Sequence, residues 1–170
     1  MLTGAALYRT AFEHEIYANH AMLKMLAGVP EANRSDPLFQ RAVSIAAHMA
    51  TCREDFLALF LGERLTFREP FGILSEVASL EERFMNWEAR WKEYLANLDE
   101  ARIDGTFDFQ DSGHTWRMSL EAQLFQLIGH AAYHRGQVVL LVDMLGGESV
   151  DTDFVDWYCA ANPSSWSMVD

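Results

Sequence analysis

A continuous helical pattern between Ser119 and Gly147 constrains the fold of this chain more than any other part of its sequence. Apolar residues recur at helical spacing from Leu127 to Leu141, which is typical of a long helix with one side in a protein core. His130 and His134 lie four residues apart, so both imidazoles stack on that same side of the helix. The core-facing side of one helix therefore carries two histidines.

A buried imidazole is costly unless its ring nitrogens find a partner. Two explanations fit His130 and His134. A metal ion would satisfy both side chains at once. Alternatively, both are ordinary core histidines bonded to backbone carbonyls, which is the favoured explanation for an isolated His-x-x-x-His pair. Residues elsewhere in the chain are needed to distinguish a metal site from ordinary core histidines.

Three further segments have the apolar periodicity of amphipathic helices. We expect long helices over residues 3–27, 37–61, 79–98 and 119–145. Asp36 followed by Pro37 is a typical helix start, and Ser79 with Glu82 has the spacing of a capping box. Four long amphipathic helices predict an all-α protein, a four-helix bundle that forms a single domain over residues 1–170.

Three shorter features complete the predicted architecture. Residues 105–109 and 114–118 alternate around a turn, which predicts a small β-hairpin before the last long helix. Residues 63–78, which include Phe67 and Phe71, are expected to connect two helices over the bundle surface. A short helix near residues 153–158 is expected to pack against the bundle.

The second long helix adds a third histidine to the predicted core. Its inward stripe consists of Leu38, Ile45, His48, Cys52, Phe56 and Phe60. Three neutral imidazoles, from His48, His130 and His134, suit zinc, nickel or iron and leave one coordination position open. Without a carboxylate ligand, such an ion keeps its full charge and binds hydroxide, carboxylate or thiolate. We expect Cys52 to be a small buried hydrophobe, with a fourth metal ligand as the alternative.

Charge and missing motifs exclude several function classes. The 170 residues carry a formal net charge of −12, which disfavours nucleic acid and anionic membranes as partners. No signal peptide and no apolar run of transmembrane length is evident, so we expect a cytoplasmic protein. Ferritin-like Glu-x-x-His pairs are absent, and His14-Glu15 does not continue into a zincin motif because position 18 is alanine.

The segment His130-Ala-Ala-Tyr-His-Arg-Gly-Gln137, together with the upstream His48, resembles the DinB-like superfamily of metal-binding four-helix bundles, also called DinB/YfiT-like metalloenzymes. The segment Tyr17-Ala-Asn-His-Ala-Met-Leu23 is similar to an element of the family's first helix, and Asp153-Phe154 is similar to its tail. The resemblance covers residues 7–158.

The resemblance implies that His48, His130 and His134 are the metal ligands. It also implies a homodimer and a small-molecule substrate, because relatives include S-transferases that use bacillithiol, mycothiol or glutathione. A metal-bound thiolate that attacks an electrophile agrees with the chemistry of a three-histidine site. A metal-hydroxide hydrolase would use the same ligands. A third hypothesis is a non-catalytic, metal-stabilised bundle for binding or stress response, which a closed site with Cys52 as fourth ligand would favour.

Several neighbours are candidates for the wall or the support of the site. Many members of the family that the chain resembles carry histidines where this chain has Gln126 and Tyr133. The resemblance therefore does not identify the substrate of this chain. Gln126 and Gln137 can orient a ligand imidazole, and His14 and Tyr17 are candidate pocket residues. We expect Arg135 to make a structural ion pair, with anion capture as the alternative. Gly136 is expected to allow close approach of another helix.

Overall fold

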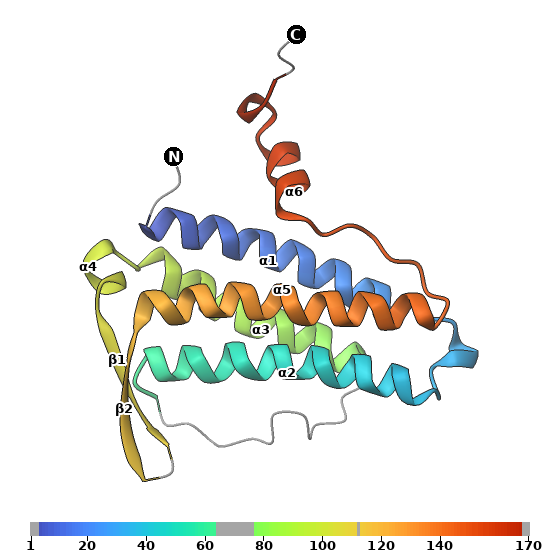
Figure 1. Ribbon diagram of the computed structural model, residues 1–170, viewed down its shortest axis with the longest axis horizontal. Helices are drawn as coiled ribbons and strands as arrows, with labels where there is room; N and C mark the ends of the chain where they lie inside the picture. The colour runs from blue at the N-terminus through green and yellow to red at the C-terminus, as the bar shows by residue number, and fades with distance from the viewer. Residues whose placement is uncertain (1–3, 64–76, 112, 168–170) are drawn as a thin grey trace.

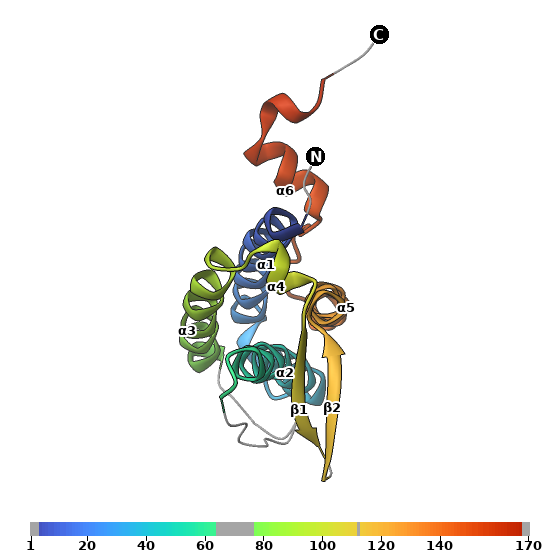
Figure 2. The same cartoon turned by 90° about the vertical axis from the view of Figure 1, so that its left-hand side faces the viewer.

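The computed structural model describes residues 4–63, 77–111 and 113–167. Its four long helices are α1 (Gly4–Ala27), α2 (Pro37–Phe60), α3 (Val77–Ala96) and α5 (Leu120–Met144). Viewed along the bundle, α1 and α2 lie on one diagonal, and α3 and α5 lie on the other (Figures 1 and 2). Helix α5 therefore packs against both α1 and α2. The predicted all-α bundle is confirmed.

The shorter elements are η1 (Glu31–Asn33), α4 (Glu100–Ile103), β1 (Thr106–Asp111), β2 (His114–Ser119), α6 (Phe154–Ala161) and η2 (Pro163–Ser165). These elements flank the bundle: η1 lies at one end, α4 and the two strands lie at the other, and the C-terminal helices lie beyond α1 (Figure 1). Strands β1 and β2 form the predicted antiparallel hairpin, in which Phe109 pairs with Trp116. The hairpin leads directly into α5.

The helix ends follow the capping residues in the sequence. The side chain of Asp36 accepts a hydrogen bond of 2.8 Å from the backbone N–H of Leu38, and Pro37 opens α2. The hydroxyl of Ser119 accepts one of 3.2 Å from the N–H of Ala122 and caps α5. These caps fix where α2 and α5 begin.

Helix α3 begins earlier than its sequence suggests. It starts at Val77, so Ser79 lies inside its first turn and does not mark its start, and it ends at Ala96. The unpredicted helix α4 follows after Asp99, whose carboxylate accepts a hydrogen bond of 2.8 Å from the N–H of Arg102. The prediction for the connection that carries Phe67 and Phe71 lies outside the described residues.

The core is one apolar cluster enclosed by the four long helices. Its largest fully buried side chains include Trp91, Phe84, Met22, Leu26, Ile45 and Leu57. The aromatic stripe of α3 packs into this cluster, as Trp91 contacts both Phe12 and Phe60. None of the described helices combines the length and the apolar character needed to cross a membrane.

The C-terminal segment leaves the bundle. Helix α6 was expected to pack against it, but none of its residues is buried, and it projects outward beyond α1 (Figures 1 and 2). Its contact with α1 runs through His14, whose ring centroid lies 5.3 Å from that of Phe154 and 5.5 Å from that of Trp157. The apolar side chains of this helix therefore do not cover the core.

Candidate metal centre

Three imidazoles from two helices lie close together around Nε2 of His130. His48 comes from α2, and His130 and His134 come from α5. The Nε2 atom of His130 lies 3.2 Å from Nε2 of His48 and 3.1 Å from Nε2 of His134. The i, i+4 spacing on α5 and the direct packing of α2 against α5 bring these nitrogens together.

Hydrogen bonds alone do not account for this convergence. The Nε2 atom of a neutral imidazole carries either one hydrogen or one lone pair, directed along a single line in the ring plane. The Nε2 atom of His130 therefore cannot form full hydrogen bonds with both of its close neighbours. Two short contacts between ring nitrogens at one imidazole are typical of ligands around an ion.

The distances also fit a single ion. A tetrahedral ion with metal–nitrogen bonds of about 2.0–2.1 Å holds its nitrogen ligands about 3.3 Å apart. The separations of 3.1 and 3.2 Å around His130 are close to that value. The two nitrogen–nitrogen contacts of His130 are thus suited to a divalent first-row metal.

Cys52 lies beside the histidines, one turn after His48 on α2. Its Sγ atom is 3.6 Å from Nε2 and 3.8 Å from Nδ1 of His48. His48, Cys52 and His130 each offer a ligand atom within 4.8 Å of the others, and together they can hold a metal ion. Burial, followed by the negative charge of Asp55, raises the pKa of the Cys52 thiol to about 11, so without a metal the thiol keeps its proton.

Gln137 fixes the orientation of one imidazole. The Nδ1–H of His134 donates a hydrogen bond of 2.8 Å to the amide oxygen of Gln137. That bond places the ring hydrogen on Nδ1, which leaves the lone pair of Nε2 directed at the cluster. Gln137 therefore presents His134 in the form that a metal binds.

Burial keeps His130 in the neutral form as well. Burial is the largest cause that lowers its pKa, to about 4, and the nearby His134, His48 and Arg53 act in the same direction. A neutral imidazole is the form that coordinates a metal. At neutral pH this side chain has no proton to lose before it binds.

One family of known proteins matches this chain. The sequence model of the DinB family matches residues 2–164. The chain belongs to the DinB family. Neither the curated proteins nor the solved structures contain a significant match to it. Membership confirms the resemblance found in the sequence.

Two of the remaining site candidates of this DinB-family chain face solvent near the histidines. Gln126 is exposed one turn before His130, so it does not support a ligand imidazole in this structure. Tyr133 is also exposed, and its ring centroid lies 5.0 Å from that of His134. The hydroxyphenyl ring therefore forms part of the outer wall beside the cluster.

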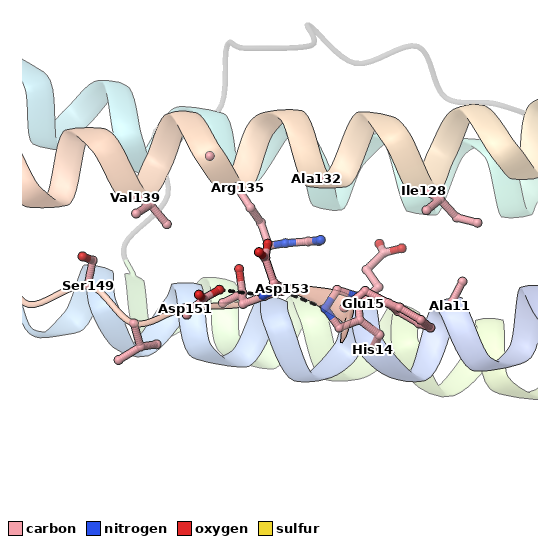
Figure 3. A pocket seen from close by; sticks show the side chains of 14 residues that line it. Ala11, His14, Glu15, Ile128, Ala132, Arg135, Val139, Ser149, Asp151 and Asp153 are labelled. Carbon is pink, nitrogen blue, oxygen red and sulfur yellow. Dashed lines mark hydrogen bonds between the residues drawn. The ribbon is translucent and has the colours of Figure 1, made fainter. Parts of the chain in front are cut away.

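The other candidates lie on a different side of α5. His14 and Arg135 line a cavity of about 630 Å³ between α1, α5 and residues 149–154, and none of the three clustered histidines lines it (Figure 3). The Nε2–H of His14 donates a hydrogen bond of 2.7 Å to the carbonyl oxygen of Thr152. Tyr17 is exposed on α1, with its ring centroid 6.5 Å from that of His14. The structure thus separates these residues from the candidate metal centre.

Two predictions about this side of α5 were wrong. Within the described residues, Arg135 makes no ion pair, and its guanidinium donates a hydrogen bond of 3.1 Å to the amide oxygen of Asn19. A Cβ atom added at Gly136 would meet nothing within 4 Å, so the glycine does not serve close helix packing. It borders the cavity instead. The Asn19 contact joins α1 to α5.

The sequence analysis did not single out one buried ion pair beside the site. The carboxylate of Glu15 on α1 accepts two hydrogen bonds from the guanidinium of Arg53 on α2, one of them 2.8 Å long at Nε. The guanidinium also lies 4.9 Å from the ring centroid of Trp91. One sequence signal could have revealed this pair. Phe12, Glu15 and Asn19 follow one another at helical spacing, which places all three side chains on the inward side of the helix. Because this carboxylate is already paired, it is not free to act as a general base.

Proposed function

We propose that this DinB-family protein is a metal-dependent enzyme that transfers a low-molecular-weight thiol to an electrophilic small molecule. The proposed metal ligands are His48, His130 and His134. The observation that carries the proposal is the convergence of their Nε2 atoms at 3.1 and 3.2 Å. When bound there, zinc, nickel or iron would supply a positive charge, not cancelled by a carboxylate, that favours the thiolate form of a bound thiol.

Residues around the proposed metal each have a specific role in this mechanism. The rings of His130 and His134 would provide lone pairs, and the amide of Gln137 holds the orientation of His134. The exposed ring of Tyr133 lies beside His134, with the ring centroids 5.0 Å apart. The carboxylate of Glu15 is held by Arg53, so it is not available as the base.

The sulfur of Cys52 lies 3.6 Å from Nε2 of His48, so a sulfur atom lies beside the proposed ligands. A metal-hydroxide hydrolase remains the second candidate, because its ligand set is the same. A non-catalytic, metal-stabilised bundle is the third, since a permanent bond to Cys52 would close the site.

The first test is the metal content of the protein, purified without an affinity tag. We expect one first-row metal ion per chain in the native protein and in His114→Ala, because His114 is exposed on the hairpin. His130→Ala is expected to lose the ion. A metal-free native protein that also fails to bind zinc, nickel or iron on titration would contradict the proposal.

A second test separates the three candidate functions. The metal-loaded protein is incubated with glutathione, cysteine or bacillithiol and a chromogenic aryl halide, and separately with a nitrophenyl ester. Product that requires both thiol and metal supports thiol transfer. Ester cleavage without thiol indicates the hydrolase. A loaded protein that is inactive in both assays supports the non-catalytic bundle.

We also propose that the protein is a homodimer formed through the outward side of α5. Four large apolar side chains are exposed there: Phe125 at 71%, Tyr133 at 64%, Leu140 at 61% and Met144 at 62%. Between Glu121 and Asp143 the only charged side chain of this helix is Arg135, which is buried. Two copies with a net charge of −12 repel each other, so an uncharged apolar side is the surface on which a second copy fits best.

The two cysteines bear on the cellular location. Cys52 and Cys159 are both unpaired thiols. Free thiols and a thiol co-substrate both persist in a reducing compartment. We therefore place the proposed reaction in the cytoplasm.

A further inference from the structure

We propose that the cavity between α1 and α5 is a second binding site, for an α-amino acid with an apolar side chain, and that Arg135 binds the carboxylate of this ligand. The cavity has a volume of about 630 Å³, within the range of roughly 300–1,000 Å³ that is usual for small-molecule sites. Its lining, over the described residues, includes none of the three clustered histidines, so this site is separate from the proposed metal centre.

Arg135 brings a buried positive charge to the cavity. Its side chain leaves α5 and points toward α1 across the cavity (Figure 3), and the residue is buried. Among the residues that the structure describes, its guanidinium has one hydrogen-bond acceptor, the neutral amide oxygen of Asn19. A guanidinium has five N–H donors, so most of them remain for a ligand. Burial is the main cause that lowers the pKa of Arg135, as expected for a charge without a counter-ion.

The nearby buried carboxylate does not neutralise this charge. Glu15 lines the same cavity from α1, but both of its carboxylate oxygens accept hydrogen bonds from Arg53 on α2. Two buried guanidiniums therefore share one carboxylate, and the three groups together carry an excess positive charge. A carboxylate from solution would remove this excess, and arginine binds carboxylates through two parallel hydrogen bonds. The buried part of the cavity thus favours a carboxylate group.

The exposed part of the cavity has the opposite charge. Asp151 and Asp153 line it from the segment before α6, and both residues are exposed. Neither carboxylate takes part in an ion pair within the described part of the chain. Both carboxylates repel a simple anion and attract an ammonium group. A ligand that matches both parts of the cavity therefore carries a carboxylate and an ammonium group, as an amino acid does.

His14 lies between the two opposite charges. Burial is the main cause that lowers its pKa, so the ring adds no charge to the cavity at neutral pH. The charges of Arg135 and Asp153 both act on the pKa of this ring. Both groups therefore lie within electrostatic range of one residue, which suits a small ligand that carries both charges on neighbouring atoms.

The rest of the lining is mainly apolar and suits the side chain of such an amino acid. It includes Ala11, Ile128, Ala132, Val139, Val150 and Phe154. Gly136 also borders the cavity, and a Cβ atom added there would meet nothing within 4 Å. A large side chain at position 136 would therefore occupy space that the ligand needs.

Isothermal titration calorimetry of the full chain, purified without an affinity tag, tests the site. The probes are L-leucine and L-phenylalanine, and we expect at least one of them to bind saturably. Isocaproate and hydrocinnamate lack the ammonium group of these amino acids, and isopentylamine and phenethylamine lack the carboxylate. The matching analogues should bind at least about tenfold more weakly than the amino acid, because one charged group of the cavity loses its partner.

Two variants locate the binding. Arg135→Gln removes the charge and keeps an amide that can contact Asn19, whereas Gly136→Leu fills the cavity and removes none of its polar groups. Both are expected to lose the amino acid. Gly129→Leu is the matched control, because a Cβ at this position of α5 also meets nothing within 4 Å and Gly129 does not line the cavity. It should bind as the native chain does.

Each outcome supports or overturns the amino-acid site. If neither amino acid binds to the native chain, the cavity is not such a site. An amino acid that chelates a metal ion at the histidines would still bind to Gly136→Leu, and that result would overturn the proposal. Isocaproate or hydrocinnamate that binds as tightly as its amino acid would also contradict it. If Arg135→Gln fails to fold, the comparison of Gly136→Leu with Gly129→Leu decides.

Discussion

The ring Nδ1–H of His134 donates a hydrogen bond of 2.8 Å to the side-chain oxygen of Gln137, one turn further along α5. This contact sets the tautomer of a proposed metal ligand from outside the ligand set. Supporting hydrogen bonds of this kind hold a ring in place and raise the basicity of its other nitrogen. Gln137 therefore acts on the proposed metal centre through His134.

Replacement of Gln137 by alanine is expected to lower metal affinity by roughly 10–100-fold, since His134 loses the partner that fixes its ring. Competition with a coloured chelator would measure the change. Gln126→Ala is the matched control, because Gln126 is exposed on the same helix and should leave the affinity unaltered. Equal affinities for all three proteins would remove Gln137 from the support of the site.

The ion pair between Glu15 and Arg53 leads to a prediction about stability. Both side chains are buried, and removal of one partner leaves the other charge buried without compensation. We expect Glu15→Ala to lower the free energy of unfolding by about 3–5 kcal/mol, measured by urea denaturation of the metal-free protein. The replacement of both residues by apolar side chains, Glu15→Leu with Arg53→Met, should recover most of the loss.

An exposed ion pair supplies the comparison. Asp108 and Arg117 face each other across the hairpin, and both side chains are largely exposed. Asp108→Ala should leave the free energy of unfolding nearly unchanged, because solvent screens this pair. A loss as large as that of Glu15→Ala would show that burial is not the reason for the importance of Glu15.

The fold was largely predictable because local signals and helical periodicity agree in this chain. Asp36 and Ser119 cap their helices as expected, and the aromatic stripe of α3 faces the core. The start of α3 was wrong because the Ser79 box matches a cap motif, but the helix extends two residues further toward the N-terminus. Capping motifs indicate a helix end only where the preceding residues do not continue the helix.

The position of α6 could not be read from the sequence. Its apolar residues indicate that the helix needs a partner but do not identify which surface provides one. The same limit applies to Arg135, since a charged residue on an inward stripe needs a partner whose identity depends on tertiary packing. That partner is the neutral amide of Asn19, more than a hundred positions away in the chain.

The histidine cluster was accessible to sequence reasoning for a simple reason. His130 and His134 share a helix side, and His48 falls on the inward stripe of α2, so packing of α2 on α5 brings all three together. The distance of Cys52 to His48 depends on side-chain rotamers and could not be predicted. His14, by contrast, lies on α1 and faces the separate cavity.

His14 predicts a dependence of stability on pH. Burial is the main cause that lowers its pKa, and Arg135 acts in the same direction, whereas the hydrogen bond to Thr152 and the charges of Glu15 and Asp153 oppose the shift. On acidification the unfolded chain binds a proton at this residue before the folded chain does, so the stability contributed by His14 is present at neutral pH and is lost as pH falls below the unfolded value.

The measurement is the free energy of unfolding of the metal-free protein between about pH 8 and pH 5. His130, whose pKa is also lowered, adds to the slope in the native protein and in the variant alike. His14→Gln should therefore show a smaller loss of stability on acidification than the native protein. Parallel curves would mean that the proton affinity of His14 is the same in both states.

The proposed dimer leads to a prediction about α5. A glutamate at position 140 would place two added charges against each other in a symmetric interface, because each copy contributes the same surface. Sedimentation velocity should show a dimer for the native chain and a monomer for Leu140→Glu. Trp116→Glu is the matched control, since Trp116 is an equally apolar, exposed residue on the hairpin, and it should remain dimeric. A native chain that stays monomeric at all concentrations, or a dimeric Leu140→Glu, would show that this side of α5 does not bind a second copy.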